Sequence, residues 1–269
     1  MQTEPSYDMQ DLLRVMARLR DPEHGCPWDL AQDFRSIVPS TLEECYELVA
    51  AIEQGDFPHV AEELGDVLFQ VVFYSQLGQE QERFDFSQIV STLVDKLLRR
   101  HPHVFEGGEI EGLVETESSV QDVNYNWETI KKQERHARSQ TGILADIPTA
   151  LPALSRAQKV QKRAAQVGFD WGHIAEVVAK VEEELREYVE AADEGSARQE
   201  EEIGDLLFSC VNLARHAGLD AEATLRRATS KFERRFQKME SACNTLGQAM
   251  EELNAQALDE QWRLAKDSE

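Results

Sequence analysis

The sequence has few cysteines, and none of them stands in a C-x-x-C pair. Cys45 and Cys210 fall within apolar stripes of helical period, so we expect both to be small core residues. The other two are Cys26 and Cys243. This sparse, unpaired use of cysteine gives no sign of a disulfide framework and favours a reducing compartment.

Basic residues and long apolar runs are also scarce. The chain has 28 lysines and arginines against 51 acids, a net charge of -23. Such a chain is repelled by DNA phosphates, although metal ions or a local basic cluster would let it bind a small polyphosphate. The N-terminus "MQTEPSYDMQDLL" lacks a signal-peptide pattern, and no apolar run is long enough to span a bilayer. We therefore expect a cytoplasmic protein that binds neither nucleic acid nor membrane.

The alternation of apolar and polar residues that marks a half-buried strand is missing. Apolar residues recur instead at steps of three and four, as in Leu64, Val67, Leu68, Val71 and Val72. Similar stretches begin near Thr41, Phe86, Ala175, Glu200 and Ala221. Because 41% of the residues are hydrophobic, a sizeable core is available. The sequence therefore predicts an all-α fold.

A serine and several prolines mark the expected helix ends. Ser40 with Glu43 three residues later predicts a capping box at the start of a helix. Pro58 lies at a second helix start, and Pro102 lies just past a helix end.

Four features of the sequence occur twice in the same order. The first copies are "GCPWD", E-x-x-E followed by E-x-x-D, "KLLRR" and "WETIK"; the second are "GFDWG", the same acid pattern, "KFERR" and "WRLAK". The offset between copies falls slowly from 143 to 135 residues, as small insertions in the first half require. We therefore predict a tandem duplication with two all-α domains, residues 1–137 and 138–269.

The repeated acids share one flank of an apolar helical stripe. At about 100° per residue, Glu44 and Glu47 fall on one side of the stripe. Glu63 and Asp66 do the same in the next helix, so antiparallel packing of the two stripes brings four carboxylates to one edge. The matching acids of the second half are Glu184, Glu187, Glu202 and Asp205.

Four facing carboxylates repel one another unless a cation lies between them. A hard divalent cation with oxygen ligands removes the repulsion, and Mg²⁺ fits best. A single E-x-x-E is usually only a solvated helix face. Two matched pairs that occur twice favour a metal site over that interpretation.

Basic clusters follow the acids in each half. Lys231, Arg234 and Arg235 lie within about one helical turn, as do the matching Lys96, Arg99 and Arg100. Alone, such a cluster could complement a helix dipole or pair with surface acids. Beside a metal site it predicts a phosphate-binding groove. Trp262 with Lys266 adds a ring suited to stacking on a nucleobase, although a lone tryptophan is more often a core or interface residue.

Together these motifs resemble the MazG family of the all-α NTP pyrophosphatase superfamily. The acid pattern, "RRHPHVF", "IPTALPALSRAQKVQKRAAQVGFDW" and the terminal W-x-x-x-K carry the resemblance, which is weakest at 106–119 and 240–258. It implies four-helix-bundle-like modules, an intertwined homodimer and dependence on Mg²⁺, with Mn²⁺ as a substitute. It also implies hydrolysis of nucleoside triphosphates to monophosphates and pyrophosphate, broad base tolerance and a role in nucleotide-pool housecleaning.

The resemblance assigns roles residue by residue in the second half. It implies that Glu184, Glu187, Glu202 and Asp205 bind the metal, and that Lys180, Lys231, Arg234 and Arg235 meet the triphosphate. Trp262, with Lys266 beside it, would meet the base. The first-half acids Glu44, Glu47, Glu63 and Asp66 are then a second copy of the metal set.

The two copies differ one helical turn before the first acid. Lys180 stands four residues before Glu184, whereas Ser40 occupies that position before Glu44. We therefore expect the C-terminal domain to be the main catalyst and the first copy to be a structural or regulatory site. Two alternatives stay open: a base-selective dUTP or dCTP pyrophosphatase, and a non-enzymatic helical interaction protein stabilised by metal.

Overall fold

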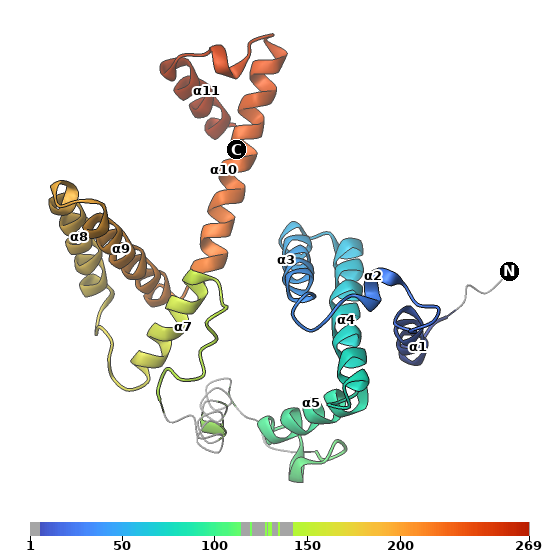
Figure 1. Ribbon diagram of the computed structural model, residues 1–269. Coiled ribbons are helices and arrows are strands. Elements are labelled where there is room, and N and C mark those ends of the chain that lie inside the picture. The colour runs from blue at the N-terminus through green and yellow to red at the C-terminus, as the bar shows by residue number, and fades with distance from the viewer. Residues whose placement is uncertain are drawn as a thin grey trace. The chain divides into compact units, whose positions relative to one another are not determined.

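The computed structural model describes residues 6–113 and 142–268, with the isolated positions 119, 127, 129, 130 and 134. Across these residues the chain forms helices and no strand (Figure 1), so the predicted all-α class is confirmed. None of the helices described is both long and apolar enough to cross a bilayer. The chain divides into two compact units, Met1–Lys131 and Lys132–Glu269. The predicted boundary between residues 137 and 138 lies outside the described residues.

The first unit is organised around one long helix, α4, which packs against α1, α3 and α5. Its elements are α1 (Met9–Leu19), α2 (Pro27–Leu30), α3 (Val38–Gln54), α4 (Phe57–Glu80), α5 (Phe86–Arg100) and the short 3-10 helix η1 (Glu106–Gly108). Its core joins Met16 of α1 and Ile37 to Val72, Phe73 and Leu77 of α4.

A buried arginine ties α1 to the far end of α4. The Arg20 side chain is almost inaccessible, and its Nε donates to Glu80 Oε1 at 2.8 Å while Nη2 donates to Oε2 at 2.7 Å. Such a bidentate ion pair fixes the orientation of the guanidinium as well as its distance from the carboxylate. It also holds the pKa of Glu80 below its usual value.

Helix ends in the first unit agree with the sequence except at Ser40. Pro58 lies in the first turn of α4, and α5 ends before Pro102, as predicted. The capping box at Ser40 is wrong, because α3 already begins at Val38 and Ser40 lies inside its first turn with no side-chain cap. Pro39 explains the error: proline is compatible with a first helical turn, whose N–H groups have no partner within the helix, so it need not precede the helix.

The second unit contains a packed helix pair, α8 and α9, that corresponds to α3 and α4 of the first unit, and it adds the long helix α10. Its elements are α7 (Ala153–Ala165), α8 (Ile174–Glu190), η2 (Ala191–Asp193), α9 (Ser196–His216), α10 (Ala221–Thr245), η3 (Met250–Glu252) and α11 (Ala255–Asp267). Helix α8 packs along α9, α7 contacts both α9 and α10, and α11 lies against α10 (Figure 1). Asp220 and Asn254 cap α10 and α11 with their side chains.

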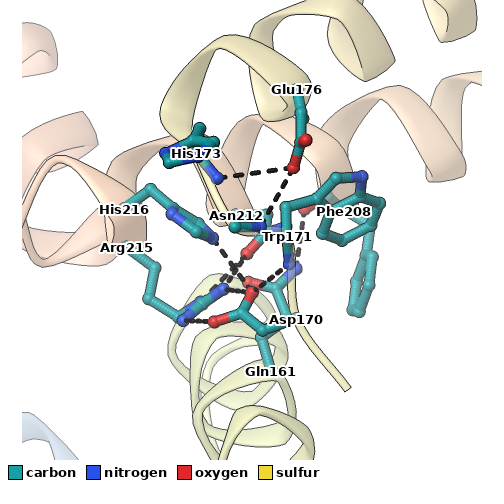
Figure 2. A network of polar contacts seen from close by, with 10 residues as sticks. Gln161, Asp170, Trp171, His173, Glu176, Phe208, Asn212, Arg215 and His216 are labelled. Atoms are coloured by element: carbon teal, nitrogen blue, oxygen red, sulfur yellow. Dashed lines mark hydrogen bonds and ion pairs between the residues drawn. The ribbon is translucent and has the colours of Figure 1, made fainter. Parts of the chain in front are cut away.

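A polar network fastens the segment before α8 to the end of α9 (Figure 2). Asp170 accepts two hydrogen bonds from the Arg215 guanidinium and lies 3.0 Å from His216 Nε2. Asn212 Oδ1 accepts from Arg215 Nε at 2.9 Å, which holds the guanidinium in place. Deeper in the unit, Gln161 of α7 donates to the carbonyl of Phe208 at 2.8 Å. The bonds to Asp170 therefore hold the segment before α8 against the end of α9, and the Gln161 bond holds α7 against α9.

Asp170 therefore makes stability depend on pH. Hydrogen bonds from Arg215, with help from His216 and against the effect of burial, lower the pKa of Asp170 to about 2. A carboxylate with a lowered pKa stabilises the fold at pH values above its ordinary pKa, which is near 3.8. This stabilisation is lost as the pH falls toward 2. We expect Asp170→Asn to lower the free energy of unfolding by about 1–2 kcal/mol at pH 7. Urea denaturation should show the difference shrinking below pH 4, and equal stabilities at pH 7 would contradict the assignment.

The expectation that Cys45 and Cys210 are core residues is wrong, since both are exposed in the chain, whereas Cys243 is buried. Their neighbours on the same stripes, such as Leu185 and Leu207, are also about half exposed. The apolar stripes of both helix pairs are thus wider than the surface that the partner helix covers.

Candidate active site

Helices α8 and α9 bring the acids of the second half together. Glu184, Glu202 and Asp205 each offer a carboxylate oxygen, and these oxygens lie within 4.8 Å of one another. Glu184 and Glu202 are 4% and 1% exposed, which is unusual for glutamate, whereas Asp205 is exposed. Glu187 is outside this closest group, but its charge contributes to the raised pKa of Glu202. The predicted set is therefore one cluster in space.

Two cations from the same helices neutralise part of this cluster. Lys180 Nζ lies 2.7 Å from Glu184 Oε1 and 2.7 Å from Glu183 Oε1. Arg198, one turn before Glu202 on α9, pairs with Glu202 Oε1. The second oxygen of each buried acid, Oε2 of Glu184 and of Glu202, is buried with no hydrogen-bond partner. A buried carboxylate oxygen without a donor is costly, and a bound cation would remove that cost.

The surroundings raise the pKa of a carboxyl and of an ammonium group in this cluster, for different reasons. Burial raises the pKa of Glu202, and Glu187, Glu184 and Asp205 raise it further, while Arg198 opposes them. Hydrogen bonds to Glu183 and Glu184 raise the pKa of Lys180, so its ammonium stays charged. The cluster is thus an acidic site with built-in positive charge at its edge.

Helices α3 and α4 form a similar cluster in the first unit. Glu44, Glu47 and Glu63 offer oxygens within 4.8 Å of one another. Burial, and then the charges of Asp66, Glu47, Glu63 and Glu43, raise the pKa of Glu44. Glu63 is 6% exposed; its Oε1 lies 2.7 Å from His59 Nε2, and its Oε2 is buried without a partner.

Both clusters fit a hard divalent cation on the same grounds. Their ligand atoms are carboxylate oxygens from two packed helices, close enough to share one ion. Mg²⁺ and Mn²⁺ prefer such oxygen ligands, whereas zinc sites usually include histidine or cysteine.

The basic and aromatic candidates lie on the other helix pair of the second unit. Lys231, Arg234 and Arg235 are on α10, and Trp262 and Lys266 are on α11. The ring of Trp262 packs against Phe232, with ring centres 4.9 Å apart and planes tilted by 41°, and Phe232 stacks on Phe236. Within the described residues, neither Lys231 nor Arg234 is bonded to the acid cluster.

Sequence reasoning missed two groups of this site. Arg198 precedes Glu202 by four residues, the spacing at which a helix brings side chains together. Phe232 and Phe236 have the same spacing within the basic cluster. In both cases the spacing was the available signal.

Comparison with known proteins places the chain in a family. Residues 32–105 and 173–239 match the MazG nucleotide pyrophosphohydrolase domain, so the predicted duplication is confirmed. The nucleoside triphosphate pyrophosphohydrolase of Escherichia coli K12 is 49% identical over 261 residues, 96% of this chain and 97% of that protein. The nucleoside triphosphate pyrophosphohydrolase/pyrophosphatase MazG of Thermotoga maritima is 44% identical over 257 residues, 96% of this chain and 95% of that protein. The chain therefore belongs to the MazG family of nucleotide pyrophosphohydrolase enzymes.

Proposed function

We propose that this chain hydrolyses nucleoside triphosphates to nucleoside monophosphates and pyrophosphate in its C-terminal unit, with Mg²⁺ as cofactor. The observation that carries the proposal is the α8–α9 cluster, where two buried glutamates each keep one oxygen without a partner. The names of the E. coli and T. maritima relatives support the same reaction class.

Glu184, Glu187, Glu202 and Asp205 would hold the cation in this proposal, and Mn²⁺ could replace Mg²⁺. When bound, the ion supplies charge neutralisation at the phosphates and makes nearby water more acidic. Lys180 is already within reach of the acids, and it would move its ammonium from Glu183 to a phosphate oxygen. Lys231, Arg234 and Arg235 would bind the remaining phosphate charge, since charge-assisted hydrogen bonds to phosphate are strong.

The reaction itself is an in-line displacement at the α-phosphorus. The oxygen of a water molecule forms the new bond to phosphorus, and the bond from phosphorus to the bridging oxygen breaks. The electron pair leaves with pyrophosphate, and the proton of the water passes to a carboxylate of the cluster. Lysine and arginine side chains stabilise the negative charge that develops on the leaving group.

We expect the enzyme to accept nucleotides with different bases because of the aromatic residues on α10 and α11. Trp262 with Phe232 forms an aromatic surface, and stacking on such a surface accepts every nucleobase. An enzyme of this kind would remove unwanted nucleotides from the cytoplasmic pool, which is the housecleaning role.

The experiment that tests this proposal is a pyrophosphate-release assay on the eight common ribo- and deoxyribonucleoside triphosphates, with Mg²⁺ and with a chelator. We expect release from all eight with Mg²⁺ and none with the chelator. Release from one or two bases alone would identify a base-selective pyrophosphatase. No release from any of them would favour the interaction protein stabilised by metal.

We also propose that the chain forms a homodimer through the uncovered stripes of its helix pairs. Leu185 of α8 and Leu207 of α9 are about half exposed, and Val189 of α8 is 64% exposed. This is more apolar surface than a helix pair usually leaves to water. Gly204, between Glu202 and Asp205, has open space where a side chain would stand, although glycine weakens a helix. Both features suit the close approach of another helix.

Light scattering at micromolar concentration should therefore give twice the 30.6 kDa of one chain. A double substitution, Val189→Lys with Leu207→Lys, should shift the mass to one chain, because it places charges in the apolar contact. The matched control is Glu190→Lys, one residue along on the exposed flank. A wild-type mass of 30.6 kDa would refute the dimer.

A further inference from the structure

We propose that Gln158 of α7 is a positioning residue for the proposed reaction. Its amide fixes the direction in which α10 leaves the turn after α9, and so it places the basic residues of α10 that would meet the phosphates. This inference rests on the proposed function. It also gives a role to the segment "IPTALPALSRAQKVQKRAAQVGFDW", which contains α7.

The acids and the basic residues of the second unit lie on different helices. Glu202 and Asp205 are on α9, whereas Lys231 and Arg234 are on α10. Residues 217–220 join the two helices, and α7 contacts both of them (Figure 1). The direction of α10 at this turn therefore decides where its basic residues lie relative to α9.

Small changes of direction at the turn are amplified along α10. Arg234 lies thirteen residues after Ala221, which is about 20 Å along a helix. A tilt of about 10° at the start of α10 would thus move the backbone at Arg234 by about 3 Å. Binding and catalytic groups lose much of their effect when they are misplaced by about 1 Å. Correct placement of these cations therefore requires that the turn be held firmly.

Gln158 holds the turn through its side-chain amide. The residue is 5% exposed, and its Nε2 donates to the carbonyl of Leu219 at 2.8 Å. Its Oε1 accepts from the N–H of Ala221 at 2.9 Å. Ala221 is the first residue of α10, so its N–H has no partner within the helix. One side chain of α7 thus bonds to the backbone on both sides of Asp220, the residue that caps α10.

The α9 side of the turn is fixed by other bonds. Gly218 has a positive φ of 74°, and the N–H of Leu219 donates to the carbonyl of Ala214 at 2.9 Å, an arrangement common at helix C-termini. These features do not involve Gln158. Loss of the Gln158 amide would therefore leave the end of α9 intact and release the start of α10 from its two bonds to α7.

Gln161, one turn further along α7, supplies the matched control. It is 7% exposed, and its Nε2 donates to the carbonyl of Phe208 in α9 at 2.8 Å. Because that partner is in α9, Gln161→Met removes a buried hydrogen bond of α7 and leaves the two bonds at the turn in place.

The test measures binding of α,β-methylene-ATP, whose α–β bridge resists hydrolysis, to the full-length chain by isothermal titration calorimetry with Mg²⁺. Gln158→Met keeps the size of the side chain and removes both bonds. We expect it to raise Kd at least about tenfold, because charge-assisted hydrogen bonds to phosphate are lost. Gln161→Met should leave Kd nearly unchanged. Gln158→Glu keeps an acceptor for the Ala221 N–H, so it should fold even if the methionine variant does not, with a smaller rise in Kd. An unchanged Kd in both folded Gln158 variants, or an equal rise in Gln161→Met, would overturn the inference.

A combined variant separates positioning from a general loss of structure. In a chain that already carries Lys231→Ala and Arg234→Ala, Gln158→Met has fewer cations to misplace and should raise Kd by no more than about twofold. A further rise of about tenfold in that background would show that Gln158 does not act through these cations. A wild-type chain that neither binds the analogue nor releases pyrophosphate from ATP would refute the proposed function and this inference with it. A wild type that does both, beside a Gln158→Met chain that binds normally, would refute the inference alone.

Discussion

Alanine at Glu187 or Asp205 is expected to remove nearly all nucleoside triphosphate hydrolysis. Both carboxylates belong to the α8–α9 cluster, where their charges act on the buried Glu202. Without either one, the site would hold its cation more weakly and out of position. Stabilisation of transition-state charge by a metal is worth several kcal/mol, so the loss should be on the order of a thousandfold in kcat/KM. Pyrophosphate release under saturating Mg²⁺ measures it.

The matched controls are alanine at Glu47 and Asp66, which occupy the same positions in the first unit. These variants should keep most of the activity, because the N-terminal cluster has Ser40 where the C-terminal cluster has Lys180, the side chain that we propose meets the phosphates. Circular dichroism and light scattering must show that all four variants fold and assemble like the wild type. Equal losses of activity in both sets would indicate two working sites. A loss confined to the first-unit variants would show that the N-terminal unit is the catalyst and would contradict the assignment to the C-terminal unit.

The second large effect is expected from Trp262→Ala. The indole ring is held against Phe232, so it is positioned before any nucleotide arrives. Stacking of a base on an aromatic side chain is worth about 1–3 kcal/mol, which corresponds to a rise in KM of about fivefold to 150-fold. The rise should be similar for all bases, since every base presents a stacking face.

Trp127→Ala supplies the comparison, because Trp127 is the aligned tryptophan of the first unit, and its ring centre lies 5.1 Å from that of His101. It should leave KM unchanged. If a folded Trp262→Ala chain also kept its Michaelis constants, Trp262 would be a packing residue.

The helices and the acid clusters could be predicted from the sequence because both depend on local spacing. Apolar residues at three- and four-residue steps define a helix face, and acids three residues apart must lie on one flank of it. The pairing of α8 with α9 then follows from burying the two stripes. The structure accordingly brings Glu184, Glu202 and Asp205 together from two helices.

The features that could not be predicted depend on tertiary contacts, that is, on which other elements pack against each helix face. Cys45 and Cys210 lie on apolar stripes and are nevertheless exposed, because one partner helix covers only part of each stripe. Ser40 has the residue type of a helix cap, but the helix starts earlier at Val38. Arg198 was one of many charged residues on α9 until the structure placed its guanidinium on Glu202.

The most direct test of the proposed chemistry is hydrolysis of ATP in ¹⁸O-labelled water, with the products and the position of the label identified by ³¹P nuclear magnetic resonance. Attack at the α-phosphorus predicts AMP and unlabelled pyrophosphate as the products, with one ¹⁸O atom in the AMP phosphate. The reaction should require Mg²⁺ and should disappear in a chain with both Glu184→Gln and Glu202→Gln. Formation of ADP and phosphate, or ¹⁸O in the pyrophosphate, would contradict the mechanism.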